Sequence, residues 1–356
     1  MSILVDRVRD VVWNRRGVSG WAAWLALQPA CGLFATAVAL RRYAYRVGVL
    51  HVHHAPIPVV SVGNLSVGGT GKTPVTLWLA RRLAAAGLRV GILLRGYSGR
   101  ASGVTVVAKG AGPEADVETA GDEAVMLAKC FDGVVVAARC RADGVAAAAQ
   151  LGCEVVVLDD GFQHLALARD FDLVLVSGGR RSLLPAGPMR ESPAALRRAD
   201  AVGVVVKDDD AGMVVPDGAQ PCFVVRFAPT ALIESEGGSW RERPLGLLSG
   251  RRIAAVAGVA NPVPFYTAVR QWETQIEEIF EFPDHHAYTR ADWQQIMRGT
   301  REIEMVVTTE KDLVKLEHFP FPRGKLVALR IAPQVEGAET LVAMILERVR
   351  LPRAAA

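Results

Sequence analysis

Residues 66–73 form a glycine-rich segment between an apolar run at residues 59–62 and a helical pattern. A segment of this kind lets several backbone N–H groups converge on a phosphate chain, assisted by the partial positive charge of a helix N-terminus. Lys72 would reach the β- and γ-phosphates, and the Thr73 hydroxyl would bind Mg²⁺. The chain is therefore predicted to bind a nucleoside triphosphate through the loop residues Gly68, Gly69, Thr70, Gly71, Lys72 and Thr73.

The loop departs from the GxxxxGK[ST] pattern at Ser66, which stands in place of the first glycine. That glycine serves backbone conformation, so a serine with negative φ fits. A glycine-rich turn that binds nothing is the alternative, but Val75 and Leu83 follow at helical spacing and Gly87 stands where the helix would end. Val67 occupies the position where ATPases with a deviant loop carry a signature lysine, which argues against that class of switch ATPase.

A second signal is the apolar run at residues 155–158, which ends in Asp159 and Asp160. A carboxylate at the end of a buried strand beside a phosphate loop holds Mg²⁺ directly or through water. A strand followed by an Asx turn is the alternative. The pattern does not show which of the two aspartates binds the metal directly.

Asp122 is a candidate general base because it stands in Gly121-Asp122-Glu123, after an inferred strand and at the start of a predicted helix. Aspartate in this place is commonly a helix N-cap. Phosphoryl transfer, however, needs a group that accepts the proton of the attacking hydroxyl. One of the adjacent His285 and His286 could approach Asp122 across a cleft between lobes, while a surface loop with solvated histidines is the alternative.

Several arginines follow predicted strands or flank the apolar segment at residues 183–188: Arg95, Arg180, Arg181 and Arg190. Arginine binds phosphate through bidentate contacts, which suits a phosphorylated substrate. A solvated charged face is the alternative for any one of them.

The elements that would position these residues alternate between strand and helix. Continuous apolar runs are typical of parallel strands buried on both faces, and ligands then bind beyond the carboxyl ends of the strands. The sequence predicts a P-loop NTPase-like, doubly wound α/β fold with a mostly parallel sheet. Its strands are expected at residues 59–62, 90–94, 134–138, 154–158, 171–176 and 201–206, and its helices at 123–129 and 141–150.

A smaller α/β lobe is predicted beyond a β-hairpin formed by residues 222–232 and 240–248. Its strands are expected at residues 253–257, 275–280, 305–308 and 326–331, before a last helix at 339–350. The predicted domains are an N-terminal membrane-associated segment (1–50), a P-loop kinase domain (51–220), a hairpin linker (221–250) and a C-terminal lobe (251–356).

Composition narrows the class of partner. Hydrophobic residues make up 51% and charged residues 22% of the 356-residue chain, which describes a globular protein with a large core. The net charge of +4 could serve anionic lipid or phosphorylated substrates, and no nucleic-acid-binding motif accompanies it. The five cysteines are odd in number, form no CxxC pair for a metal, and in part stand in apolar surroundings, where free cysteine behaves as a small hydrophobe; a reducing compartment is expected.

Residues 22–40 carry no charged side chain and are flanked by Arg15, Arg16, Arg41, Arg42 and Arg46. Their length would permit a membrane span; a cleaved signal peptide and a buried core helix are further alternatives. The pattern favours one or two interfacial helices on the cytoplasmic leaflet, with Trp21 and Trp24 near the headgroups and the arginines facing anionic lipid.

These motifs together resemble the tetraacyldisaccharide 4′-kinase family of the lipid A pathway in Gram-negative bacteria. The resemblance extends over nearly the whole chain, in order. It rests on Gly63-Asn64, residues 67–74, Arg95-Gly96-Tyr97, Gly121-Asp122-Glu123, residues 159–164, residues 184–188, Asn261-Pro262, residues 283–286 and residues 308–312.

The resemblance implies phosphorylation by MgATP of the 4′-hydroxyl of an acylated glucosamine disaccharide that carries a 1-phosphate. It also implies monotopic attachment to the inner membrane and no obligate protein partner. Asp122 would be the base, paired with His285, while Lys72 serves the phosphates. The metal would be held by Thr73, Glu123, Asp159 and Asp160, and the lipid substrate by Arg95, Tyr97, His164 and Arg190.

Two other functions are compatible with a phosphate loop. A membrane-peripheral switch or metal-insertion GTPase would need an Asn/Thr-Lys-x-Asp element, which residues 309–312 only imitate because Lys311 is followed directly by Asp312. A soluble kinase of small molecules would not need the apolar N-terminal segment.

Overall fold

A computed structural model describes residues 11–96, 99–100, 102–179, 182–206 and 220–351. The chain forms two compact units that are interleaved in sequence. The first comprises Met1–Leu93, Arg141–Arg226 and Val335–Ala356, and the second Leu94–Cys140 and Phe227–Gln334. Neither unit coincides with the predicted kinase domain over 51–220, because residues 94–140 group with the C-terminal lobe.

The first unit is built on parallel strands. Strand β1 lies between β5 and β6, while β2 pairs with β5 and β7 pairs with β6. Apart from the end of β6, every residue of these strands is buried, as the apolar runs predict. The strands are β1 (Val59–Asn64), β2 (Val90–Leu94), β5 (Val155–Asp159), β6 (Phe171–Ser177) and β7 (Ala201–Val205).

Helix α4 (Lys72–Ala85) follows the glycine-rich loop and buries Val75, Leu79 and Leu83. It begins after Gly71 and ends just before Gly87, which has a φ of +90°. The helical pattern after the loop is thus confirmed. The other helical elements of this unit's sheet region are α7 (Arg141–Gln150), α11 (Ala338–Arg350) and the 3₁₀ helix η1 (Pro193–Arg198).

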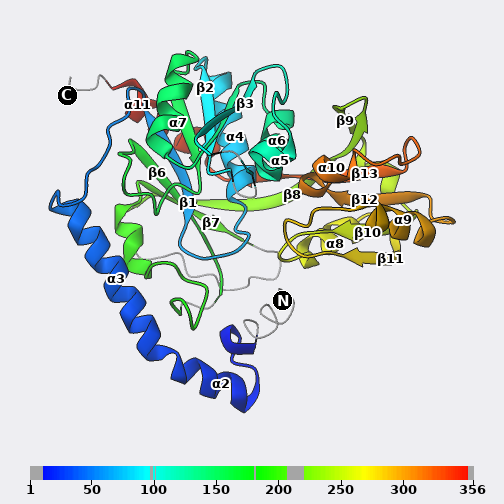
Figure 1. Cartoon of the computed structure of the whole chain (residues 1–356), viewed down its shortest axis with the longest axis horizontal. Coiled ribbons are helices and arrows are strands. Elements are labelled where there is room, and N and C mark those ends of the chain that lie inside the picture. The colour runs from blue at the N-terminus through cyan, green and yellow to red at the C-terminus, as the bar shows by residue number, and fades with distance from the viewer. Residues whose placement is uncertain (1–10, 97–98, 101, 180–181, 207–219, 352–356) are drawn as a thin grey trace. The chain divides into compact units, whose positions relative to one another are not determined.

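Two helices precede the first strand, α2 (Gly17–Ala26) and α3 (Gln28–Arg46). They form the bent blue pair in Figure 1. No described helix is by itself long and apolar enough to span a membrane, whereas α2 and α3 together pass that test of length and composition, with a bend of 43° between them. Within the pair only Gly20 and Cys31 are buried, so the alternative of a buried core helix is wrong.

The inner side of this pair contacts the loop before Arg190. Trp24 Nε1 donates to Ser182 Oγ at 3.3 Å, and Cys31 Sγ lies 3.3 Å from the carbonyl oxygen of Leu183. Arg15 Nη2 also donates to Ser182 Oγ, at 3.2 Å, so Trp24 and Arg15 are not free to face lipid as predicted.

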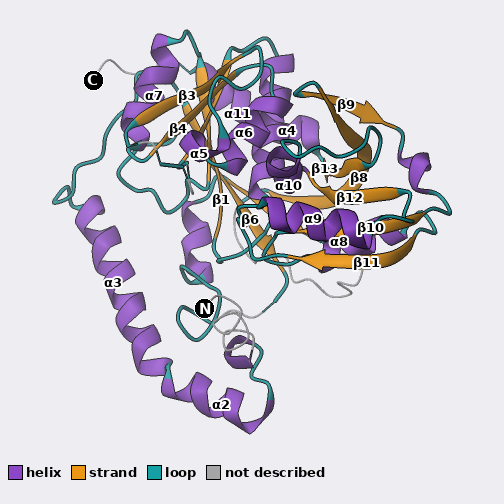
Figure 2. Cartoon of the chain, turned by 45° about the vertical axis from the view of Figure 1, so that its right-hand side comes forward, coloured by secondary structure: helices purple, strands orange, loops and turns teal. Residues whose placement is uncertain are grey.

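The second unit contains four parallel strands with helices on both faces (Figure 2). Alternate residues of β10 point to opposite sides: Ile253 and Ala255 pack with α8, and Ala254 and Val256 pack with α9 and α10. The predicted smaller α/β lobe is confirmed. Its elements are β10 (Arg252–Ala257), β11 (Gln275–Glu281), β12 (Met305–Thr309), β13 (Leu326–Val335), α8 (Val263–Arg270), α9 (Arg290–Gly299) and α10 (Glu310–Leu316).

Strand β8 (Cys222–Glu236) pairs in parallel with β7 at its start and antiparallel with β9 (Ser239–Arg243) at its end. The hairpin is confirmed, but its second strand is shorter than predicted. Pro244 has no N–H to continue the ladder, and the 3₁₀ helix η2 (Leu245–Leu248) follows.

The second unit also contains a strand that the sequence analysis missed. Strand β3 (Val104–Lys109) pairs antiparallel with β4 (Val134–Ala138). Helix α6 (Asp122–Cys130) packs against both strands and against α10, and it is preceded by the single-turn helix α5 (Val117–Ala120). This packing brings the start of α6 to the helix that follows β12.

Candidate active site

The phosphate loop has the backbone that its glycines predict. Gly68 and Gly71 have φ values of +116° and +77°, a region that side chains with a Cβ rarely adopt. No atom lies within 4 Å of an added Cβ at Gly68 or Gly69, so the loop is open to a ligand. Ser66 is not among the described non-glycine residues with positive φ, and its place in the pattern is therefore tolerated.

Asp159 lies where a carboxylate can serve a metal beside this loop. Because β1 and β5 are parallel neighbours, their carboxyl ends meet at one edge of the sheet. Thr73 Oγ1 donates to Asp159 Oδ2 at 2.8 Å, and Thr76 Oγ1 donates to Oδ1 at 3.2 Å. The hydroxyl and the buried carboxylate thus form an oxygen pair of the kind that Mg²⁺ uses together with phosphate oxygens.

The next residue, Asp160, binds two cations. Its carboxylate lies 3.7 Å from Lys72 Nζ and accepts from Arg190 Nη1 at 3.1 and 2.9 Å. Asp160 has a φ of +54°, which is uncommon for a residue other than glycine and concentrates at functional sites. Lys72, Asp160 and Arg190 therefore belong to one cluster in the first unit.

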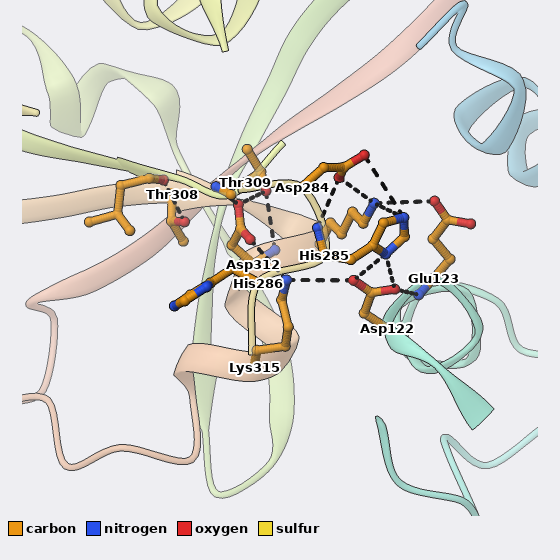
Figure 3. A network of polar contacts seen from close by, with 12 residues as sticks. Asp122, Glu123, Asp284, His285, His286, Thr308, Thr309, Asp312 and Lys315 are labelled. Atoms are coloured by element: carbon orange, nitrogen blue, oxygen red, sulfur yellow. Dashed lines mark hydrogen bonds and ion pairs between the residues drawn. The ribbon is translucent and has the colours of Figure 1, made fainter. Parts of the chain in front are cut away.

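In the second unit Asp122 is the first residue of α6 and is almost fully buried. Both of its carboxylate oxygens lie 3.1 Å from His285 Nδ1 (Figure 3). Its Oδ1 also accepts from the backbone N–H of Glu123 at 2.9 Å, and Lys315 Nζ lies 3.5 Å from Oδ2. The histidine that contacts Asp122 is His285, which belongs to the same compact unit and not to a separate lobe.

The partners of Asp122 keep it ionised. Burial alone would raise the pKa of Asp122, but the hydrogen bond from His285 and the positive charges of Lys311 and Lys315 lower it to about 2. The same hydrogen bond raises the pKa of His285 above its usual value, against burial and the charge of Lys311. At neutral pH Asp122 is a carboxylate, able to accept a hydrogen bond from a substrate hydroxyl.

Lys311 lies on the other side of the imidazole. Its Nζ is 3.2 Å from His285 Nε2, 3.1 Å from Asp284 and 3.4 Å from Glu123. An ammonium can only donate, so this contact favours the His285 tautomer with its proton on Nδ1, directed at Asp122. The sequence analysis did not assign Lys311 or Lys315 to the site, although their i, i+4 spacing after a buried strand was a usable signal.

The neighbouring histidine has a different role. His286 Nε2 lies 3.1 Å from Asp292 Oδ2, and its ring stacks on Phe282 with the centroids 4.8 Å apart. Asp292 also completes a capping box with Thr289 at the start of α9. The question that the spacing left open, which histidine pairs with Asp122, is thus answered by the contacts: His285 Nδ1 contacts Asp122, whereas His286 Nε2 contacts Asp292.

The predicted site residues are divided between the units. The loop, Asp159, Asp160, His164 and Arg190 belong to the first, whereas Arg95, Asp122, Glu123 and His285 belong to the second. Tyr97, Arg180 and Arg181 lie outside the described residues. Among the described residues no three His, Cys, Asp or Glu side chains are grouped for a metal ion.

A phosphate loop after one strand and an aspartate at the end of its parallel neighbour place the chain in the class of P-loop nucleotide-binding proteins. The model of one family, described as Tetraacyldisaccharide-1-P 4′-kinase, matches residues 23–350. Because the match includes most of the sequence, the chain belongs to the tetraacyldisaccharide-1-P 4′-kinase family, as its motifs predict.

Curated relatives agree with this family. The chain is 38% identical over 341 residues to a tetraacyldisaccharide 4′-kinase of Chromobacterium violaceum, an alignment that covers 93% of this chain and 95% of that protein. It is 40% identical over 327 residues to one from Anaeromyxobacter sp. (strain K), with 86% of each covered. A crystal structure of LpxK from Aquifex aeolicus in complex with ATP is 31% identical, has a TM-score of 0.80 and is matched over 92% of this chain and 99% of that one. The predicted fold class is confirmed.

Proposed function

We propose that this protein transfers the γ-phosphate of ATP to the 4′-hydroxyl of a tetraacylated glucosamine disaccharide 1-phosphate in lipid A biosynthesis. The observation that carries the proposal is the buried Asp122 carboxylate, bound by His285 through both oxygens, in a chain that also contains an open phosphate loop. A protein that only binds or hydrolyses nucleotide does not need a buried carboxylate that can accept a hydrogen bond from the hydroxyl of a second substrate. The family match supports the acceptor.

On the donor side, the loop residues Gly68 to Thr73 would hold the triphosphate through backbone N–H groups and the Lys72 ammonium. Thr73, Asp159 and Asp160 would hold Mg²⁺ together with phosphate oxygens, and Glu123 is the fourth ligand predicted from the family. Bound Mg²⁺ would offset the negative charge on the transferring phosphoryl group. When Lys72 binds phosphate, its ion pair with Asp160 must weaken or break.

On the acceptor side, Asp122 would orient the 4′-hydroxyl and accept its proton. Because the pKa of Asp122 is about 2, it is a weak base, and proton transfer would come late, after the O–P bond has largely formed. Its main contribution is then to position the hydroxyl. His285 would hold the carboxylate, while Arg95, Tyr97, His164 and Arg190 are proposed to bind the substrate's sugar and 1-phosphate.

The helix pair α2 and α3 is proposed to attach the protein to the cytoplasmic face of the inner membrane. Large apolar side chains on both helices are exposed, including Val18 at 87%, Leu25 at 66% and Leu33 at 75%. Such side chains suit the interface between headgroups and acyl chains, where the acylated substrate also resides. Replacing these three with serine should reduce sedimentation with anionic vesicles about tenfold or more and leave transfer to a detergent-dispersed acceptor largely intact.

The test of the function is transfer of labelled phosphate from ATP to the 1-phosphorylated tetraacyl disaccharide. We expect product only when both ATP and the lipid acceptor are present, with GTP a poor donor. Hydrolysis of GTP at the same rate with and without the lipid would contradict the proposal and favour the switch GTPase. The acceptor lacking its 4′-hydroxyl is the matched substrate control.

A further inference from the structure

Lys315 lies between two carboxylates of the second unit. Its Nζ is 3.5 Å from Asp122 Oδ2 and 3.2 Å from Asp312 Oδ1, and the side chain is 8% exposed. Figure 3 shows the ammonium directed at the carboxylate of Asp122. The ring of Tyr288 lies beneath it at 5.3 Å. A lysine is almost never buried this deeply unless it is paired with negatively charged groups.

Asp312, the second partner, is held independently of Asp122. It is fully buried, and its Oδ2 accepts from the backbone N–H of Gly258 and from Thr309 Oγ1, both at 2.8 Å. Gly258 follows β10 and Thr309 ends β12, so the carboxylate is fixed to two neighbouring strands of the parallel sheet. Lys315 thereby connects Asp122 on α6 to a rigid point in the sheet.

We propose that Lys315 is a positioning residue for phosphoryl transfer, acting through Asp122; this rests on the function proposed above. Three groups define the orientation of the Asp122 carboxylate: the N–H of Glu123 and the imidazole of His285 through hydrogen bonds, and the ammonium of Lys315 through an ion pair at 3.5 Å. The first belongs to α6 itself, and the second comes from a loop residue with positive φ. Lys315 supplies the contact that is anchored to the sheet, and it leaves acceptor capacity on the carboxylate for one hydroxyl.

The direct test is Lys315→Met, which removes the charge and keeps the length of the side chain. We expect kcat for transfer to the lipid acceptor to fall about 100-fold, the effect of misplacing a reacting group by about an ångström, with KM for ATP unchanged. Lys129→Met is the matched control: Lys129 is equally buried at 8%, in the same unit, and pairs with Glu317 at 2.9 Å. Its kcat should stay within twofold of wild type.

Two further variants distinguish a positioning role of Lys315 from a purely structural role. Lys315→Met combined with Asp312→Asn removes both members of the buried pair, and we expect it to recover thermal stability but not kcat. Recovery of kcat together with stability would overturn the inference. In an Asp122→Asn background, Lys315→Met should lower the residual kcat by no more than twofold; a further 100-fold loss there would also overturn it.

The same assay distinguishes this inference from the function on which it rests. If wild-type protein transfers no phosphate to the lipid acceptor, the proposed function fails and the inference fails with it. If wild type is active and Lys315→Met keeps full kcat, the kinase function stands and the positioning role is refuted.

Discussion

The phosphate loop and the Asp122 cluster are two different ways to build a site. The loop is one continuous segment, residues 66–73, whose contacts with a ligand would come mostly from the backbone. The Asp122 cluster is assembled by side chains from three distant segments, residues 122–123, 284–285 and 311–315. The loop's chemistry is therefore a property of its local sequence, whereas that of the cluster depends on how α6 packs against α10.

The two regions also differ in how their charges are held. Lys72 is 13% exposed and its contact with Asp160 is 3.7 Å long, so the cation is available to an incoming anion. Asp122 is 3% exposed, has hydrogen bonds with the N–H of Glu123 and with His285, and forms an ion pair with Lys315. We propose that the first region gains binding energy from a ligand and that the second holds one carboxylate in a fixed orientation. Substitutions in the phosphate loop should consequently lower kcat/KM for ATP, whereas substitutions in the Asp122 cluster should lower kcat and leave ATP affinity nearly unchanged.

The largest effect is expected at the loop. Lys72→Met removes the cation that would contact the transferring phosphate, so kcat/KM for ATP should fall about 10³-fold or more. Labelled-phosphate transfer and ATP binding by calorimetry should both be affected. Lys109→Met, which changes a half-exposed lysine paired with Glu114, is the control. A tenfold loss or less would mean that the loop does not bind ATP as we propose.

The second prediction concerns Asp122→Asn. The amide keeps the shape of the carboxylate but loses its charge, so it both orients the hydroxyl less firmly and is a far poorer proton acceptor; kcat should fall about 10²–10⁴-fold. ATP affinity should remain within about threefold, in contrast to Lys72→Met. Equal losses of ATP affinity in both variants would remove the distinction between a binding region and an orienting region.

A smaller effect separates the adjacent histidines. His285→Ala should lower kcat about 10- to 100-fold because Asp122 loses the donor that contacts both oxygens. His286→Ala should leave kcat within twofold and lower the free energy of unfolding by about 1 kcal/mol through its lost contact with Asp292. Chemical denaturation and initial rates measured on the same samples would test both. Similar kinetic losses at the two positions would contradict the assignment of His285.

The smallest effect is on stability at low pH. Burial would raise the pKa of Asp292, but hydrogen bonds from Thr289 and His286 lower it below its usual 3.8. A lowered pKa means that Asp292 stabilises the fold above about pH 4, and that this contribution, about 1 kcal/mol, is lost as pH falls through the folded-state pKa. Asp292→Asn should therefore be less stable than wild type at pH 7 and approach it as the pH falls below 3.8. A constant difference across that range would refute the titration.

Much of the fold could be predicted because its strands are continuous apolar runs. Residues 155–158 are buried on both faces, and such runs carry a strong signal. Strand β3 (Val104–Lys109) was missed because its ends are exposed and Thr105 interrupts its apolar residues, so its sequence has no such run. The end of β9 was overextended since apolar residues 245–248 continue the pattern after Pro244 has ended the ladder.

The part of the site that lies in one continuous segment could be predicted from the sequence, and the part that is assembled by packing could not. Gly68 to Thr73 can be identified from spacing alone, whereas Lys315 is significant only because α10 packs against α6. The choice between His285 and His286 depends on which ring the fold brings to Asp122, and no property of a His-His pair indicates that.

The interleaving of the two units has a consequence for the order of synthesis. Helix α11, near the end of the chain, belongs to the first unit, where it packs against α4, and Glu339 pairs with Arg82. The helix that follows the phosphate loop thus receives one of its packing partners only after residues 338–350 have been synthesised. A nascent chain stalled before residue 335 should expose the outer face of α4 and depend on chaperones, whereas release of the full chain should end that dependence.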